Sequence, residues 1–530
     1  MLNSSKIWPG IVSAVLIAVL INAALFFLLA QSRSLNIASL WQDPYLQYVT
    51  AFSLKQAFFS TLLSVGLAIP VAHALSRRRF AGKELLLKLF SMTLVLPVLV
   101  GVFGILSIYG KSGLLSDILL IFGLKWNINI YGLSGILLAH VFFNLPFATQ
   151  LLVQALNQIP CDQRRLAYQL GLQGWHQFRL IEWPYLRLQL FHATGLVFIL
   201  CFTSFATVMA LGGGPSATTI ELAIYHAIRF DFDLQTGALL ALWQLLLCGT
   251  FHLIVQCATK PIAIQGKDIN IILPPRLDSF GEKMWNYFWI GAAVLLVIPP
   301  LAMIIISGVN SSALSILKQS AIWNATITSL MLATCSAISA LSLGTTIILT
   351  SRSWRLLGKS IRANGIEIIA SLVLVVPGSV LSTGLFLMLR SYIDVFNSAF
   401  WLILTVNTMM ALPYVVKILS QPAYQLAQQY HGLCCSLGLK GLNQLRLIEW
   451  QALRAPIARA LAISFVLSTG DLGAIALVGS KDFETLPLYL FRLMGSYQMD
   501  AAAAVSLILF TVSLGCYALI EKITTWKSYA

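Results

Sequence analysis

Charged residues are scarce in this chain of 530 residues. They make up 10% of it, against roughly 25% in an ordinary soluble domain. Hydrophobic residues make up 58%, and the mean hydropathy is +0.83. This balance excludes a soluble globular protein and indicates an all-α polytopic membrane protein.

Sequence motifs typical of nucleotide-binding, catalytic or metal-binding sites are also missing. Two Gly-Lys-Ser triplets, at 110–112 and 358–360, lack the earlier Gly of a phosphate-binding loop, because Ile105 and Ser353 hold that place. The chain has no H-E-x-x-H motif, and its eight Cys form no C-x-x-C pair or metal-ligand spacing. We therefore expect no catalytic residue, no metal site and no cofactor in this chain. Any ATP and Mg²⁺ would be bound by a separate ATPase subunit.

Long apolar runs are abundant. About twelve are long enough to cross roughly 30 Å of hydrocarbon: 9–30, 52–75, 90–109, 132–156, 189–211, 236–258, 286–307, 322–350, 365–390, 398–420, 457–479 and 498–520. With a cytosolic N-terminus, 24 of the 34 Lys and Arg fall in cytosolic segments and 8 in outer ones. This excess predicts that both termini are cytosolic. It also explains the net charge of +15, so we expect a lipid bilayer around the chain and no nucleic-acid partner.

One polar segment occurs twice. Residues 170–187 read LGLQGWHQFRLIEWPYLR and residues 437–454 read LGLKGLNQLRLIEWQALR, with 12 of 18 positions identical at a constant offset of 267. Because both copies must face the same side, the offset encloses an even number of spans, which predicts two fused six-helix repeats. We assign the first half to 1–258, with a cytosolic loop at 160–187, and a linker to 259–285. The second half is 286–530, with its loop at 427–456.

Each copy predicts two short helices. The first helix runs from Cys161 to Leu170 and is ended by Gly171, a residue that tolerates the left-handed conformation. The second runs from Gly174 to Tyr185 and places Arg179 three residues before Glu182. One interpretation is an ion pair within this helix, with the following Trp at the membrane interface. The other is a docking surface for a soluble partner. The doubled match favours this interpretation, because the surrounding spans differ between the halves while the two polar segments keep the same side chains.

The repeated segment resembles a known family motif. The pattern E-A-A-x-x-x-G, followed after nine intervening residues by I-x-L-P, is typical of integral-membrane permeases of binding-protein-dependent ABC importers. Ala167, Gly171, Ile181 and Pro184 match it in the first copy, and Gly438 and Ile448 match it in the second. The chain departs from the pattern where the family Glu is Arg165 or Gly432, and where the last Pro is Gln451.

The resemblance implies that both loops are coupling helices that sit on ATPase subunits. From the motif and the repeat, we expect the coupling residues to be Ala167, Gly171, Gly174, Arg179, Ile181, Glu182, Trp183 and Pro184 in the first copy, and Gly438, Gly441, Arg446, Ile448, Glu449 and Trp450 in the second.

Longer stretches resemble the thiamine-importing members of this family, among them 94–110, 135–150 and 205–225. The resemblance covers nearly the whole chain. It implies import of thiamine or its phosphate esters across the bacterial inner membrane, with two copies of a cytosolic ATPase and a periplasmic thiamine-binding protein. The alternatives are a ferric-iron importer permease and an ion-coupled secondary transporter, which would need ionisable residues at mid-membrane.

Asp471 is an acidic residue inside the predicted span 457–479, and its counterpart in the first half is Ser204. Because thiamine is a cation, Asp471 and Ser204 are candidates for the substrate pathway. The alternatives are that Asp471 pairs with Arg459 or that this end of the span is exposed to water. Residues 212–233, which include Glu221, and residues 478–487 are expected at the outer mouth. They either contact the binding protein or form ordinary solvated loops.

Overall fold

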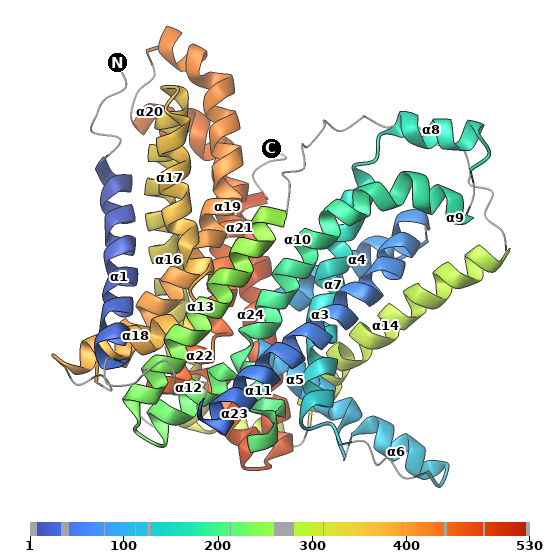
Figure 1. Cartoon of the computed structure of the whole chain (residues 1–530), viewed down its shortest axis with the longest axis vertical. Coiled ribbons are helices and arrows are strands. Elements are labelled where there is room, and N and C mark those ends of the chain that lie inside the picture. The colour runs from blue at the N-terminus through green and yellow to red at the C-terminus, as the bar shows by residue number, and fades with distance from the viewer. Residues whose placement is uncertain are drawn as a thin grey trace.

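The computed structural model describes residues 8–525, except 33–41, 79, 112, 125–128, 173, 213, 259–279, 311, 394, 396, 439–441 and 481–482. In these ranges the chain is built of helices (Figure 1). Within these described ranges, eleven helices are long and apolar enough to cross a membrane, and one bent pair is a twelfth candidate. The predicted all-α polytopic fold with about twelve spans is confirmed.

Before the predicted linker, the elements are α1 (Trp8–Ser32), α3 (Pro44–Arg77), α4 (Lys83–Val95), α5 (Val98–Tyr109), α6 (Leu114–Ile121), α7 (Leu133–Asn157), α8 (Cys161–Gln169), α9 (Gly174–Gln177), η2 (Phe178–Glu182), α10 (Trp183–Phe202), α11 (Phe205–Leu211), η3 (Pro215–Ala217), α12 (Ile220–Arg229) and α13 (Leu234–Ala258).

After it come α14 (Phe280–Gly308), α15 (Ser312–Leu317), α16 (Ser320–Leu356), α17 (Ser360–Ser371), η4 (Leu372–Leu374), α18 (Gly378–Arg390), α19 (Ala399–Ser436), α20 (Leu442–Gln444), η5 (Leu445–Glu449), α21 (Trp450–Thr469), α22 (Gly473–Val478), α23 (Leu486–Gly495) and α24 (Met499–Thr525). Of the predicted linker 259–285, residues 259–279 lie outside the described ranges and 280–285 form the start of α14.

The sequence repeat is accompanied by a repeat in packing. α3 packs against α7 and α10, and α16 packs in the same way against α19 and α21. The short helices α12 and α23 are held alike: the hydroxyl of Ser53 accepts a hydrogen bond from Ile220 N at 2.9 Å, and that of Ser329 accepts one from Leu486 N at 2.8 Å. These equivalent bonds align α12 with α23 residue by residue, with Glu221 at the place of Pro487.

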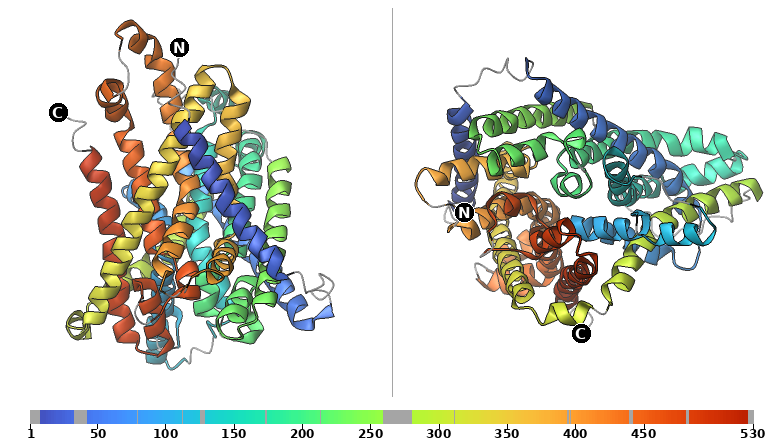
Figure 2. Two further views of the ribbon diagram at one scale, coloured as in Figure 1. Left: turned by 90° about the vertical axis from the view of Figure 1, so that its left-hand side faces the viewer. Right: turned by 90° about the horizontal axis from the view of Figure 1, so that it is seen from below.

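The first helix of each half reaches onto the other half. α1 contacts α16 and α18, while α14 contacts α3 and α5. Figure 2 shows α1, in dark blue, lying across the yellow and orange helices of the second half. The hydroxyls of Ser13 and Thr346 lie 2.8 Å apart at this crossing. A Cβ on Gly384 would come within 2.6 Å of the Ala24 carbonyl oxygen, so the absence of a side chain lets α1 and α18 approach closely.

Four predicted spans are not continuous helices, so that part of the prediction is wrong: 90–109, 189–211, 365–390 and 457–479. α4 ends at Val95 and α5 begins at Val98, and the segments 360–374 and 378–390 meet at an angle of 89°. Pro97 and Pro377 stand at these two breaks with ψ angles of 131° and 146°. A proline disfavours helical geometry in the residue before it and cannot donate the hydrogen bond that continues a helix.

Both repeated segments lie at one end of the molecule, together with the two ends of the described chain. We call this the repeat end; α8, α9 and α20 lie there, and α6, α12 and α23 lie at the opposite end (Figure 1). Within the repeat end, α8 and α9 are on one side of the molecule and α20 is on the other (Figure 1). The fold therefore places the two repeated segments apart from each other at the same end of the molecule.

Candidate functional site

The first repeated segment follows the expected course over its first helix. α8 spans Cys161–Gln169, and Gly171 has a φ of +66°. The amides of Gly171 and Leu172 donate hydrogen bonds back to the carbonyls of Tyr168 and Ala167, which closes the helix end. Gly438 has a φ of +63° after α19. The predicted role of these glycines as left-handed helix terminators is confirmed.

The second helix differs from the prediction. It does not stop at Tyr185 but continues as α9, η2 and α10 to Phe202. Five of its residues, Phe178–Glu182, are π-helical, and so are the equivalent five in the other copy, Leu445–Glu449. Single π turns inside α-helices are rare and occur frequently at functional sites. Here the π turn occurs once in each copy, and it ends on equivalent glutamates, Glu182 and Glu449.

The π turn directs that glutamate inward. Glu182 is buried, and its carboxylate lies 3.2 Å from the guanidinium of Arg77 and 3.2 Å from Nε2 of His73, both on α3. Arg77 also donates a hydrogen bond to Gln177 at 3.3 Å. The ion pair observed for Glu182 thus joins two helices, whereas Arg179, its expected partner in the same helix, is exposed.

The second copy repeats this arrangement with other elements. Glu449 is buried and lies 3.0 Å from the guanidinium of Arg352 on α16. It also accepts a hydrogen bond from Gln444 at 2.9 Å, and Gln444 is the repeat counterpart of Gln177. In each half, therefore, one buried carboxylate fastens the repeated segment to the long helix of the same half.

α8 is anchored next to the same cluster. The guanidinium of Arg164 donates a hydrogen bond to the carbonyl of Leu156 at the end of α7. Burial lowers the pKa of Arg164, and the carboxylate of Glu182 opposes this shift. Since the ordinary pKa of arginine is above 12, Arg164 stays charged and adds a cation beside Glu182.

The remaining predicted coupling residues divide by exposure. Ala167 is buried, and Ile181, Pro184, Gly174 and Ile448 are partly buried. Arg179, Trp183, Arg446 and Trp450 are exposed, as are Leu180 and Leu447 in the two π turns. We call these six exposed residues the outer faces of the two segments. Gly441 lies outside the described residues.

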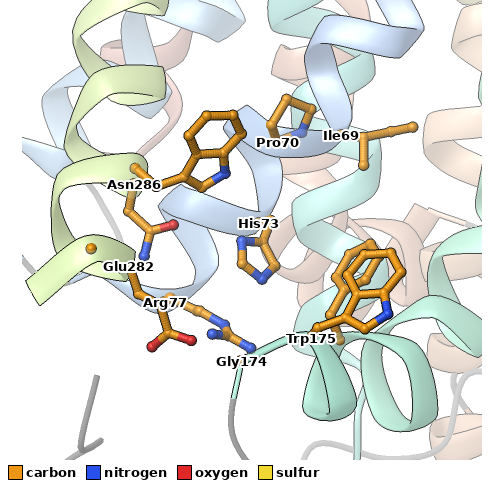
Figure 3. Close-up of a pocket in the computed structure, with 11 residues that line it drawn as sticks. Ile69, Pro70, His73, Arg77, Gly174, Trp175, Glu282 and Asn286 are labelled. Carbon is orange, nitrogen blue, oxygen red and sulfur yellow. The ribbon is translucent and has the colours of Figure 1, made fainter. Parts of the chain in front are cut away.

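A crevice of about 340 Å³ lies beside the first segment, between α3 and α14 (Figure 3). Arg77 and His73 line it from α3, and Glu282 and Asn286 line it from α14. Gly174 has a φ of +54°, which favours glycine, and its Cα lies against α14, where a Cβ would come within 2.7 Å of Glu282 Oε1. The first repeated segment therefore touches both halves of the chain.

Asp471 and Ser204, the candidate pathway residues, both stand where a helix is interrupted. Ser204 lies between α10 and α11, and Asp471 lies between α21 and α22. Asp471 accepts hydrogen bonds from the amides of Gly473 and Ala474, at 3.1 and 3.4 Å. Both side chains line one central cavity between the halves.

The segments expected at the outer mouth are only partly exposed. Glu221 is 3% exposed, so it is not a surface residue of the mouth. Arg229 donates a hydrogen bond at 2.9 Å to the carbonyl of Gly479, which joins the two expected segments. Asp233 accepts hydrogen bonds from the hydroxyl and amide of Thr236 at the start of α13, and the hydroxyl bond lowers the pKa of this aspartate.

Sequence reasoning missed Arg77, His73 and Arg352 as partners of the repeated glutamates. In the sequence, Arg77 and Arg352 are visible only as charges that orient the chain. No spacing rule links a residue of α3 or α16 to a segment about 100 residues later. A signal existed for Glu221, because it is the only charged residue in the run 217–225, ATTIELAIY. An isolated acid in an apolar stretch is a candidate for a buried position.

Comparison with known proteins gives one consistent result. A family model described as "Binding-protein-dependent transport system inner membrane component" matches residues 64–256. The chain is 43% identical over 515 residues to the thiamine transport system permease protein ThiP of Salmonella typhimurium. These 515 residues are 97% of this chain and 96% of that protein.

The ThiP protein of Escherichia coli is 44% identical over 515 residues, with the same coverage. That of Haemophilus influenzae is 39% identical over 508 residues, or 94% of this chain and 93% of the relative. The family-model match includes Arg77, the first repeated segment and Ser204. With these identities over nearly its whole length, the chain belongs to the ThiP family of binding-protein-dependent inner-membrane permeases.

Proposed function

We propose that this chain is the permease subunit of an ATP-driven importer that moves thiamine and its phosphate esters into the cytosol. A periplasmic thiamine-binding protein delivers the cargo at the end that carries α12 and α23. Two copies of a cytosolic ATPase bind at the repeat end, which places both termini in the cytosol. ATP and Mg²⁺ are held by the ATPases, and this chain supplies no cofactor site.

The observation that carries this proposal is the full-length similarity to thiamine permeases. The two repeated segments support the ATPase stoichiometry, because each presents an outer face of one Arg, one Leu and one Trp at equivalent positions: Arg179, Leu180 and Trp183; Arg446, Leu447 and Trp450. Two equivalent surfaces on one side fit two copies of one partner.

The buried and exposed residues have different roles in the proposed mechanism. The outer faces contact the ATPases, while Glu182 and Glu449 fix each segment to α3 or α16. When the ATPases close on ATP, they move both segments, and the ion pairs pass this movement to the long helices of each half. The halves then alternate between two packed states, and nucleotide binding supplies the free-energy difference between those states.

The two alternatives are less well supported. Thiamine permeases match over 97% of the chain, so a ferric-iron cargo has no comparable support. An ion-coupled secondary transporter gives no reason for two matched polar segments with equivalent buried anchors. Hydrolysis-dependent uptake separates the proposed function from the ion-coupled transporter.

The test is uptake of radiolabelled thiamine into vesicles that contain this chain and its ATPase, with the binding protein outside. Wild type is compared with the double variant Leu180→Asp/Leu447→Asp, which puts a charge on each outer face. Leu314→Asp is the matched control, because Leu314 is also an exposed leucine but belongs to α15, away from the repeat end.

We expect ATP-dependent thiamine uptake in wild type and in the Leu314 variant. The double variant should insert into the membrane but lose copurification of the ATPase. Uptake driven by an ion gradient without ATPase would refute the proposed function. Full ATPase binding by the double variant would refute only the docking role of the outer faces.

A further inference from the structure

A cavity of about 380 Å³ lies between the two halves. Its wall comes from the junction of α10 and α11, α12 and α13 in the first half, and from η4, α18, α19 and the junction of α21 and α22 in the second. Among the described residues that line it are two acids, Glu221 and Asp471, and no Lys or Arg. The cavity thus has an acidic wall with one carboxylate from each half.

Glu221 enters this wall from α12. Its Oε1 accepts hydrogen bonds from Gln244 Nε2 at 2.9 Å and from Ser379 Oγ at 3.0 Å. Gln244 belongs to α13 and Ser379 to α18, so the carboxylate is held by both halves at once. A charge at such a buried place inside a membrane protein is costly and marks a functional candidate.

The fold does not require either charge. Ser204, the repeat counterpart of Asp471, stands at the same helix break without a carboxylate, and its side chain makes no cap to α11. Pro487, the counterpart of Glu221, holds the same place in a helix of equal length and equal anchoring. Since both breaks and both short helices form without these acids in the other half, the acids serve something besides local structure.

We propose that this cavity is a transient binding site for an organic cation, the thiazolium group of thiamine, between the carboxylates of Glu221 and Asp471. This inference rests on the proposed function and adds a cargo site within the permease to it. Glu221 and Asp471 select the charge of the cargo, and Ser204 faces the same space from the first half.

Size and charge both fit this ligand. Binding cavities for small molecules have volumes from about 300 Å³ upward, so the cavity matches a molecule of two small rings. Met410 and Tyr414 supply an apolar, polarisable part of the wall. Each half contributes one carboxylate to the wall, and a cation bound between them favours the charged form of both. Binding must stay weak, because cargo that is held tightly is not released.

The experiment measures binding of radiolabelled thiamine to the permease–ATPase complex in lipid nanodiscs, without binding protein, by equilibrium dialysis. Glu221→Gln and Asp471→Asn keep the side-chain shape and most hydrogen bonds but remove the charge. The double variant Ser204→Asp/Asp471→Asn returns one carboxylate to the cavity from the other half. Asp117→Asn, an exposed acid on α6, is the matched control.

We expect each single variant to weaken thiamine binding by roughly ten- to hundred-fold, the effect of losing the attraction between one carboxylate and a cation that has no N–H to donate. The double variant should recover part of that loss, and the Asp117 variant should bind as wild type does. Unchanged binding in both single variants would overturn the inference. So would a loss in Asp471→Asn that the double variant does not recover, because Asp471 would then act through its local bonds.

This result is separable from the test of the proposed function. If wild-type vesicles fail to import thiamine from loaded binding protein, the proposed function fails. If they import it and the charge-removing variants bind thiamine normally, only the cavity site fails.

Discussion

The ion pair between Arg77 and Glu182 connects residues that are both almost fully buried, with side chains 2% and 5% exposed. Burying two charges costs desolvation free energy, which their attraction repays only when the geometry is good. Such a pair therefore adds little net stability, but removing Arg77 takes the strongest cationic partner from the buried carboxylate of Glu182 and leaves only His73 and Arg164 near it. Its use here is to fix one orientation of the repeated segment on α3.

We predict that Arg77→Met lowers the free energy of unfolding by about 3–5 kcal/mol, the usual effect of breaking a buried pair. Arg77→Met/Glu182→Leu, which removes both charges, should be less destabilised than Arg77→Met alone. Thermal denaturation of the purified permease in detergent measures both changes.

Arg179→Met is the matched control, because Arg179 is exposed and lies three residues before Glu182. Exposed substitutions of this kind usually change stability by less than about 0.5 kcal/mol. If Arg179→Met is as destabilising as Arg77→Met, the ion pair within the helix is the important one and the contact between helices is not.

The two π turns determine how each repeated segment is oriented relative to the helix that follows it. A π turn holds one residue more than the α-helical turn it replaces. Because α10 is fixed in the bundle, that extra residue sets how α8 and α9 are rotated relative to it. Removing it rotates the preceding segment by about 100°, the angle per residue in an α-helix.

We predict that deletion of Leu180 together with Leu447 abolishes stimulation of the ATPase by loaded binding protein. Both residues are exposed, so the deletions remove no core packing, yet they shift both glutamates out of register with the segments before them. The measurement is ATPase activity in nanodiscs. Leu180→Ala/Leu447→Ala, which keeps the π turns, is the control for loss of the side chains, and it should retain more activity than the deletion. Equal activity in deletion and wild type would show that the π turns have no role in coupling.

Comparison of the helices with the sequence shows which of their features were predictable. The repeat identified the polar segments, their glycine terminators and their common side, because side-chain identity and glycine geometry are local properties. The π turns were missed because FRLIE has no feature that distinguishes it from an α-helix. The breaks at Pro97 and Pro377 were visible as residues, but the apolar stretches around them are long enough for continuous spans. Only packing decides between a kinked and a broken helix.

For the whole molecule, the least predictable feature is the exchange of first helices between the halves. Periodicity identifies α1 and α14 as spans but contains no information on their neighbours. In the structure, α1 contacts α16 and α18, and α14 contacts α3 and α5. Each half thus contributes one helix to the other, and these helix contacts join the halves within the described part of the chain.

We therefore predict that the chain can be divided into two fragments, with residues 259–279 removed, without loss of assembly. When 1–258 and 280–530 are coexpressed, the two fragments should copurify and import thiamine with the ATPase and binding protein. A tag on one fragment and quantification of the other measure the assembly.

The exchange itself is tested in this split system by Gly384→Ala. The new Cβ would meet the backbone of α1 at Ala24 within 2.6 Å, and backbone cannot move aside as a flexible side chain can. Copurification should fall, whereas Gly365→Ala on α17, where a Cβ has no neighbour within 4 Å, should leave it intact. Equal copurification of both variants would mean that α1 does not hold the halves together. Fragments that fail to assemble even without a substitution would assign that role to residues 259–279, and the importer would then depend on a covalent connection between its halves.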